Sequence, residues 1–258
     1  MAGGKLTPRQ KMINLMYLVF IAMLAMNMGK EVLSAFGLMN EKFETANKSA
    51  TETNQGMMQA LDAKAAEAGG EFAVAAGTAH KVEAATKKFY DFLGGLKADA
   101  TKGTKPEDAT NYEVMDKADN LDNALFVGEG YAPRGNAVIA AIDTYKAEMK
   151  AALGKKKKYS AILNQVNAAF NTADVANKEG LKIKFLDYHF KGFPQIASVA
   201  KISAWQNDAK KAESDVISAA LGKAAVQAAS YSNYQAIVVL EKNAYFQGEN
   251  VKGKVVLG

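Results

Sequence analysis

Cysteine is absent from the 258 residues of the chain, and histidine occurs only as His80 and His189. The absence of cysteine excludes disulfides, thiol nucleophiles and cysteine-based metal sites, and it is compatible with an oxidising compartment without requiring one. Two histidines also argue against a multi-histidine metal site. Both are interpreted as packing or surface residues, because His80 lies in alanine-rich helical sequence and His189 lies among aromatic residues.

Motifs for catalysis and nucleotide binding are also missing. The sequence contains no P-loop, no GxSxG elbow, no HExxH and no paired zinc-ligand spacing. Gly128 and Gly130 form a glycine pair, but a third glycine and a preceding strand are lacking. The net charge of +5 is modest and indicates no nucleic-acid partner. We therefore expect no enzymatic activity, no cofactor and no bound metal.

Charged residues are missing from Met12 to Gly29, a run of eighteen residues, and no acidic residue precedes Glu31. A helix of eighteen residues spans roughly 27 Å, close to the ~30 Å hydrocarbon core of a bilayer. The run could be a cleaved signal peptide, a buried helix of a large domain or an uncleaved signal anchor. A signal peptide has a shorter apolar run and a small-residue cleavage site. Helical sequence instead continues after Lys30, which favours the anchor.

The residues before this run predict its orientation and its first turn. The basic residues that precede it are Lys5, Arg9 and Lys11. By the positive-inside rule they place the N-terminus in the cytoplasm and about 230 residues outside it. Thr7 is expected to cap the helix, with Pro8 at the first helical position and Gln10 completing a capping box. Arg9 therefore lies in the first turn, where the helix dipole disfavours a cation.

Arg9 has two interpretations. It could be a snorkelling residue that binds lipid phosphate, or a cation that pairs with a carboxylate on a partner helix. Other polar residues of the segment are also expected to meet partner helices, because amides exposed to lipid would remain unsatisfied. Those assigned to such contacts are Lys11, Asn14 and Asn27. Tyr17 lies about five residues inside the run, deeper than a typical interfacial residue.

A stripe of small residues predicts that the anchor forms a homodimer. Ala22, Ala25 and Gly29 recur at positions i, i+3 and i+7 of the run. Small residues at this spacing let two helix backbones approach closely in lipid. We expect this stripe to pack against its counterpart in a second copy.

Helical periodicity continues from Lys30 to about residue 229. The exceptions are a polar dip or helix junction at residues 47–54, loops at 99–111 and 128–135, and an irregular aromatic link at 181–193. Lys155–Lys158 is interpreted as a solvated helix start, and Pro194 as the beginning of a long helix that carries Trp205. From Tyr234 the sequence becomes β-branched and alternates in a strand–turn–strand pattern.

The predicted fold class is all-α for most of the chain, a transmembrane helix plus a periplasmic helical bundle, with β-strands of an incomplete second domain at the C-terminus. The predicted segments are a cytoplasmic N-terminus at 1–11, a transmembrane helix at 12–29, the bundle at 30–230 and a truncated β-rich domain at 231–258. A strand piece of about 25 residues cannot bury a core by itself.

The N-terminal sequence GGKLTPRQKMINLMYLVFIAMLAMNMGKEVLSAF resembles the GldM family, called PorM in non-gliding relatives. This family is the inner-membrane component of gliding motility and type IX secretion. The most specific part of the resemblance is TPRQKMINLMYLVFIAMLAMN. The resemblance extends over the whole chain, which would correspond to the N-terminal half of a longer protein. It implies that two such helices pass through a ring of GldL copies, where proton flow drives motion of the periplasmic part. C-terminal domains missing here would contact outer-membrane-associated components.

The resemblance also has a consequence for the proton carrier. Flagellar-stator and ExbD-type units carry a carboxylate on the inner helix, whereas this helix has none. The carboxylate is therefore expected on the ring partner, with Arg9 as its counter-charge and Tyr17 as a hydrogen-bonding neighbour. Two alternatives stay open. One is a static scaffold, and the other is a membrane-anchored sensor, for which eleven N-terminal residues supply no output module.

Overall fold

The structure is a computed structural model that describes residues 7–108, 110–154, 156–176, 180–222, 236–240 and 253–257. Side chains of residues 22–28, of residue 106 and of the last two segments are outside this description. Helices dominate the described part of the chain, in agreement with the prediction that most of the chain is all-α.

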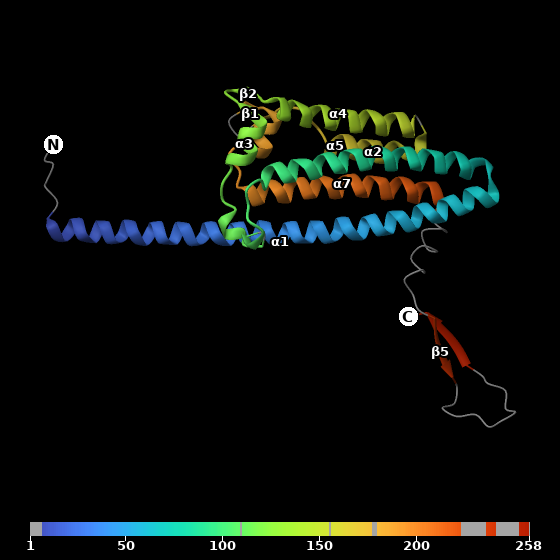
Figure 1. The fold of residues 1–258 in the computed structure, drawn as a ribbon, viewed down its shortest axis with the longest axis horizontal. Helices are drawn as coiled ribbons and strands as arrows, with labels where there is room; N and C mark the ends of the chain where they lie inside the picture. The colour runs from blue at the N-terminus through green and yellow to red at the C-terminus, as the bar shows by residue number, and fades with distance from the viewer. Residues whose placement is uncertain are drawn as a thin grey trace.

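One helix is much longer than the others. α1 runs without interruption through Pro8–Ala68, 61 residues, which corresponds to roughly 90 Å. Figure 1 shows its C-terminal half along one side of the bundle and its N-terminal half projecting beyond the bundle. The predicted break at residues 47–54 is therefore wrong, because the helix passes through this polar stretch. Within the described residues, no helix has a segment both long and apolar enough to cross a membrane.

The helices that follow fold back along the C-terminal half of α1. α1 ends at Ala68, and the positive φ angles of Gly69 and Gly70 (59° and 52°) reverse the chain directly into α2. The remaining helices, with three short 3-10 turns, are α2 (Gly70–Ala100), η1 (Pro106–Asp108), η2 (Tyr112–Val114), α3 (Asp119–Leu125), α4 (Pro133–Leu153), η3 (Lys157–Tyr159), α5 (Ser160–Ala169), α6 (Phe185–Phe190) and α7 (Gln195–Leu221).

α7 is the central helix of the bundle. Eighteen of its 27 residues are buried, and it packs between α1 and α2 and also against α5. Its Trp205 stacks on Phe185 with ring centroids 6.0 Å apart. The main core is continued between α2 and α4, where Phe89 stacks on Tyr145 at 4.7 Å. Helix α7 ends at Leu221 rather than near residue 229, and residues 223–235 are outside the described part.

Strands occupy a small part of the structure. β5 (Ala236–Leu240) pairs antiparallel with β6 (Gly253–Leu257), which agrees with the predicted switch to strands near the C-terminus. Two short ladders were not expected before that point. They are β1 (Phe126–Val127) with β2 (Gly130–Tyr131), and β3 (Val175–Ala176) with β4 (Lys182–Ile183). Each ladder has two residues per strand, so both act as turns between helices and form no sheet layer.

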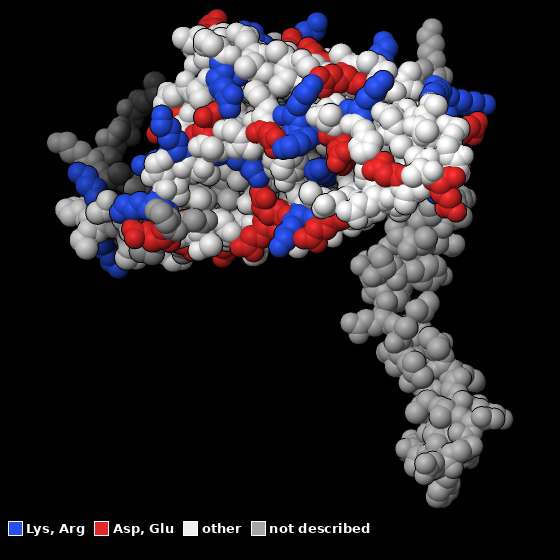
Figure 2. All heavy atoms as spheres, turned by 45° about the vertical axis from the view of Figure 1, so that its right-hand side comes forward, with Lys and Arg blue, Asp and Glu red and all other residues white. Residues whose placement is uncertain are grey.

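Two further local predictions are corrected. The irregular link at 181–193 contains β4 and the short helix α6, and residues 112–125, which fall in the helical sequence expected between two loops, are divided into η2 and α3. Basic and acidic side chains are intermingled over the face of the bundle seen in Figure 2, as expected for a chain with a modest net charge. No large area of one sign covers the described residues of that face.

Candidate functional site

The projecting half of α1 carries the predicted site residues. Thr7 caps this helix, because its side-chain Oγ1 accepts a hydrogen bond from the backbone N–H of Gln10 at 3.4 Å. Pro8 is the first residue of the helix, so the predicted starting point of this helix is confirmed. From residue 7 to residue 21, every side chain is exposed in the isolated chain. These described residues of α1 therefore make no contribution to the core of their own bundle.

Arg9, Lys11, Asn14 and Tyr17 are all exposed along this projection. Among the described residues, none forms a side-chain hydrogen bond or an ion pair with any of these four. Gly29 is likewise exposed, and apart from its own helix no described atom lies within 4 Å of the position that a Cβ would take. The side chains of Ala22, Ala25 and Asn27 lie outside the described residues. The roles assigned to all eight residues stay predictions.

A segment of four residues packs against α1 and forms polar contacts with it at the point where α1 emerges from the bundle. We call residues 112–115 the clasp. The ring of Tyr112 lies directly on the backbone of Gly37, where a Cβ atom would overlap the ring. The Tyr112 hydroxyl donates a hydrogen bond to Glu41 Oε1 at 2.6 Å. Desolvation, together with this hydrogen bond, raises the pKa of Tyr112 to about 12, so the hydroxyl stays protonated and continues to donate.

The clasp also ties α1 to the beginning of α7. Glu113 pairs with Lys30 Nζ at 2.9 Å, one helical turn before Leu33. Met115 is buried with Leu33 and Ile196 in a small cluster of its own. The carbonyl of Met115 accepts a hydrogen bond from the Ile196 N–H at 3.3 Å. The first residues of α7 and the emerging part of α1 are therefore held by the same short segment.

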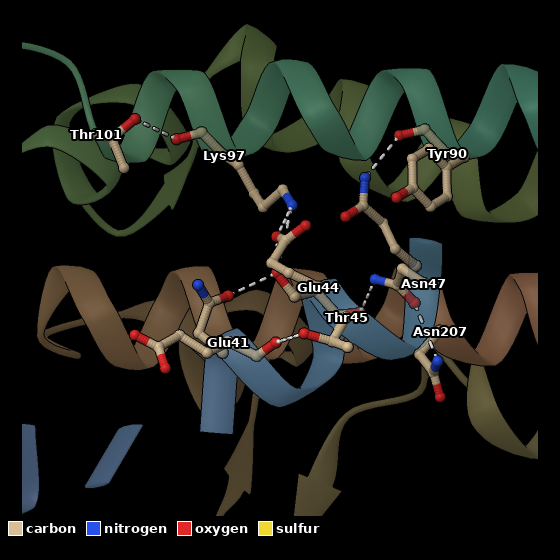
Figure 3. Close-up of polar contacts among 11 residues, drawn as sticks. Glu41, Glu44, Thr45, Asn47, Tyr90, Lys97, Thr101 and Asn207 are labelled. Carbon is tan, nitrogen blue, oxygen red and sulfur yellow. Dashed lines mark hydrogen bonds and ion pairs between the residues drawn. The ribbon is translucent and has the colours of Figure 1, made fainter. Parts of the chain in front are cut away.

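A line of buried polar residues joins α1 to α7 deeper in the bundle. Asn47 is fully buried, and its Nδ2 donates to the carbonyl of Ser203 at 3.1 Å. Its Oδ1 accepts a hydrogen bond from Asn207 Nδ2 at 3.0 Å, as Figure 3 shows. Asn54 repeats the first contact one heptad later, donating to the carbonyl of Lys210 at 3.1 Å. We call these contacts the polar seam.

Side chains from three helices meet in the polar seam. Lys97 on α2 pairs with Glu44 on α1, and it also donates to Ser203 Oγ on α7 at 3.3 Å. The Ser203 hydroxyl lies 2.9 Å from Glu44 Oε1 and 2.7 Å from Asn40 Oδ1. Because hydrogen bonds need closer and better aligned atoms than apolar contacts, this group fixes how α1, α2 and α7 sit together.

The polar seam has a heptad register. On α1 the repeating positions are Leu33, Asn40, Asn47, Asn54 and Leu61, and on α7 they are Ile196, Ser203, Lys210 and Ile217. The two asparagine–carbonyl bonds both join residues 156 apart in sequence. A constant offset means that α1 and α7 run parallel and stay in register, as in a coiled-coil pair. Polar residues in such an interface specify register at a cost in stability.

Ionisable groups near this interface are perturbed by burial. Burial raises the pKa of the Glu213 carboxyl, whereas the neighbouring Lys210 ammonium at 3.0 Å opposes the shift. His189 lies beside Phe185 and Trp205, and desolvation lowers its pKa to about 4. Within the described part of the chain, no group of acidic or histidine side chains could hold a metal ion.

Sequence reasoning missed both the clasp and the polar seam. The signal for the seam was present, because asparagine recurs at every seventh residue through the stretch that was interpreted as a break. The clasp left no comparable pattern, since Gly37 and Tyr112 are separated by loops and an entire helix.

A family model for the GldM N-terminal domain matches residues 31–223. The match covers about three quarters of the sequence. The chain belongs to the GldM family. This membership connects it with the gliding motility and type IX secretion machinery, an assembly associated with the inner membrane. No match was found among curated proteins.

The GldM domain coincides with the bundle. It begins next to Lys30, whose ion pair with the clasp marks the point where α1 emerges, and it ends just after Gly222, which terminates α7. The clasp and the polar seam therefore lie inside the GldM domain. The projecting half of α1, with the predicted anchor and Arg9, precedes the domain.

Proposed function

We propose that this GldM chain is a mechanical, non-catalytic component of an inner-membrane motor driven by the proton motive force. Its projecting α1 residues would lie as a homodimer inside a ring of a membrane partner that resembles GldL. The helical bundle would lie in the periplasm and move with α1 relative to the ring, and that motion would power secretion and gliding. Further domains of the protein would pass the motion to outer-membrane-associated components.

The continuity of α1 is the observation that supports this proposal most strongly. One unbroken helix contains both the predicted span and the asparagines of the polar seam. A helix transmits rotation and tilt along its axis because each residue is fixed by backbone hydrogen bonds to the next turn. The clasp and the polar seam bind this helix to α2 and α7. Movement of the span would therefore move the bundle as a body.

Proton coupling is proposed to involve Arg9. Arginine stays protonated at any working pH, so Arg9 cannot carry the proton itself. It can lower the pKa of a partner carboxylate, and separation of the two would let that carboxylate take up a proton. Movement of the helix relative to the ring would make and break this contact. Tyr17, two turns further along α1, is the proposed hydrogen-bonding neighbour.

Two alternatives use the same architecture. A static scaffold needs the anchor and the bundle, but it does not need a stiff connection between them. A membrane-anchored sensor would need an output module on the cytoplasmic side. The experiment below separates the motor from the scaffold through the stiffness of α1.

The test is a kink at Glu31, which is exposed and has no ion pair among the described residues. Glu31→Pro removes one helix hydrogen bond and places the proline ring against the preceding turn, which kinks a helix. Glu31→Ala removes the same carboxylate and keeps the helix straight, so it is the matched control. We expect Glu31→Pro to abolish secretion and gliding at normal protein levels, while Glu31→Ala retains both. Normal gliding of the proline variant would favour the static scaffold.

A further inference from the structure

The end of the bundle at which α1 emerges exposes several large apolar side chains. The fractions exposed are 49% for Val114 in the clasp, 65% for Val127 at the β1–β2 turn, 46% for Tyr188 on α6 and 42% for Phe193 before α7. We call these four residues the proximal face. Val74, which is 60% exposed, lies on α2 close to the α1–α2 turn at the opposite end.

The elements of the proximal face are joined to one another by hydrogen bonds. Lys184 Nζ donates to the carbonyl of Glu129 at 2.6 Å, which ties the start of α6 to the β1–β2 turn. The Gly192 N–H donates to the Asp122 carboxylate on α3 at 3.0 Å, next to Phe193. The backbone bond from Ile196 to Met115 then links the start of α7 to the clasp. These apolar side chains therefore belong to one supported end of the bundle.

The clasp sets the position of this end along α1. Glu113, the neighbour of Val114, pairs with Lys30, and the apolar run of α1 ends one residue earlier at Gly29. In Figure 1 the β1–β2 turn, α3 and the clasp all lie at the end of the bundle where α1 leaves it, with the β1–β2 turn on the side away from α1. A span that ends at Gly29 would bring this end of the bundle to the membrane surface, because a helix rises only about 1.5 Å per residue.

We propose that the proximal face extends past the partner ring around α1, rests on the lipid surface beyond it and inserts its apolar side chains among the lipid headgroups. The proposal depends on the proposed function, because it requires α1 to cross the membrane. Tyrosine is enriched at such interfaces, and lysine reaches the headgroups while its methylene stem stays on apolar surface. Tyr188 supplies the aromatic side chain, and Lys184 and Lys191 supply the cations.

Charge alone does not explain this surface. Lys191 is paired with Asp187 at 3.0 Å, and the clasp itself contributes Glu113. We therefore assign the contact to apolar insertion, with a small electrostatic contribution. A second attachment of this kind would act as a bearing, because it would restrain tilt of the bundle while leaving it free to slide over lipid headgroups.

The absence of cysteine makes single-cysteine labelling of the full chain straightforward. Val127→Cys, labelled with an environment-sensitive fluorophore, would be reconstituted into vesicles of phosphatidylethanolamine and phosphatidylglycerol. Val74→Cys is the matched control, since it is an equally exposed valine at the other end of the bundle. Leu18→Cys, within the apolar run of α1, reports whether the helix inserts.

We expect the Val127 label to emit at shorter wavelength than the Val74 label and to be quenched by lipids that carry a nitroxide near the headgroup. The difference should persist from about 0.1 to about 0.5 M salt, because apolar insertion is not screened. Loss of the quenching at the higher salt would overturn apolar insertion.

The Leu18 label separates the two proposals. If it is quenched by deeply placed nitroxides while the Val127 label behaves like the Val74 label, the lipid contact is wrong and the anchor stands. If the Leu18 label is not quenched, the anchor is wrong and the lipid contact fails with it.

Discussion

The ring of Tyr112 lies against the backbone of Gly37, and the space between them admits no side chain larger than hydrogen. The two residues come from the clasp and from the point where α1 enters the bundle. Glycine in the middle of a helix costs about 1 kcal/mol relative to alanine. Gly37 is needed at this position because any larger residue would displace the ring of Tyr112 from the helix.

The first prediction compares two glycines of α1. Gly37→Ala should lower the melting temperature, because the new methyl group displaces Tyr112 and with it the hydrogen bond to Glu41. Gly56→Ala is the matched control, since nothing lies within 4 Å of a Cβ there, and it should raise the melting temperature. Fluorescence of Trp205, the only tryptophan, measures both transitions. In a Tyr112→Ala background, Gly37→Ala should become stabilising, and a purely additive double variant would contradict the contact.

The second prediction concerns the polar seam. Asn47→Ala removes a donor to Ser203 and an acceptor for Asn207, and it should cost about 1–3 kcal/mol in the free energy of unfolding. Ser49→Ala, two residues away on the exposed side of α1, should change it by less than about 0.5 kcal/mol. Denaturant titration followed by Trp205 fluorescence compares the two. Equal effects would mean that the seam does not stabilise the bundle.

The third prediction concerns His80, which joins the far ends of α1 and α2. Its Nε2 lies 2.9 Å from Asp62 Oδ1, and its Nδ1 lies 3.1 Å from Glu83 Oε2. The hydrogen bond to Asp62 is the main cause of a raised pKa. The stabilisation is therefore full below the unfolded-state pKa of about 6.5, and it is lost as pH rises through the folded-state pKa.

His80→Gln should consequently lower the melting temperature at about pH 5.5 and have little effect at about pH 8.5. The adjacent exposed Lys81, changed to glutamine, should show no such dependence. A destabilisation by His80→Gln that is independent of pH would show that the contacts do not require the protonated ring.

The fourth prediction concerns His189 and has the opposite sign. Burial lowers its pKa to about 4, so the folded protein favours the neutral ring. Stability should fall as pH decreases from about 6.5 toward about 4, where the unfolded chain binds the proton more readily. His189→Phe removes this group and keeps an aromatic ring beside Trp205. The variant should lose less stability than the wild type on acidification, and identical pH profiles would contradict the assignment.

The fifth prediction returns to Arg9. Arg9→Ala should stop gliding and secretion while the chain still co-purifies with its membrane partner, because the counter-charge of the proposed carboxylate is lost. Arg9→Lys should retain part of the function, since charge survives without the bidentate geometry of the guanidinium. Normal motility of the alanine variant would rule out the ion pair. Loss of co-purification would assign Arg9 to assembly.

The amino-acid sequence by itself determined those helix ends and strands that depend only on neighbouring residues. The Thr7 cap, the end of α4 before Gly154, and the strands after Tyr234 all follow from residues within a few positions of one another. Caps, glycine stops and β-branched alternation act through backbone dihedral angles and short hydrogen bonds, so neighbouring residues suffice. The helix through the apolar run at residues 12–29 follows from local sequence for the same reason.

Tertiary structure decided the meaning of the polar stretch at residues 47–54. In isolation, its asparagines and threonines suggested a break, because such side chains compete with the helix backbone for hydrogen bonds. In the folded chain Asn47 and Asn54 instead bond to carbonyls of α7, whose own seven-residue repeat lies 156 positions later. The helix continues because a distant partner satisfies these amides. The same holds for Gly37. A glycine within a helix lowers helix stability, and only the tertiary structure shows that the ring of Tyr112 occupies the space beside it.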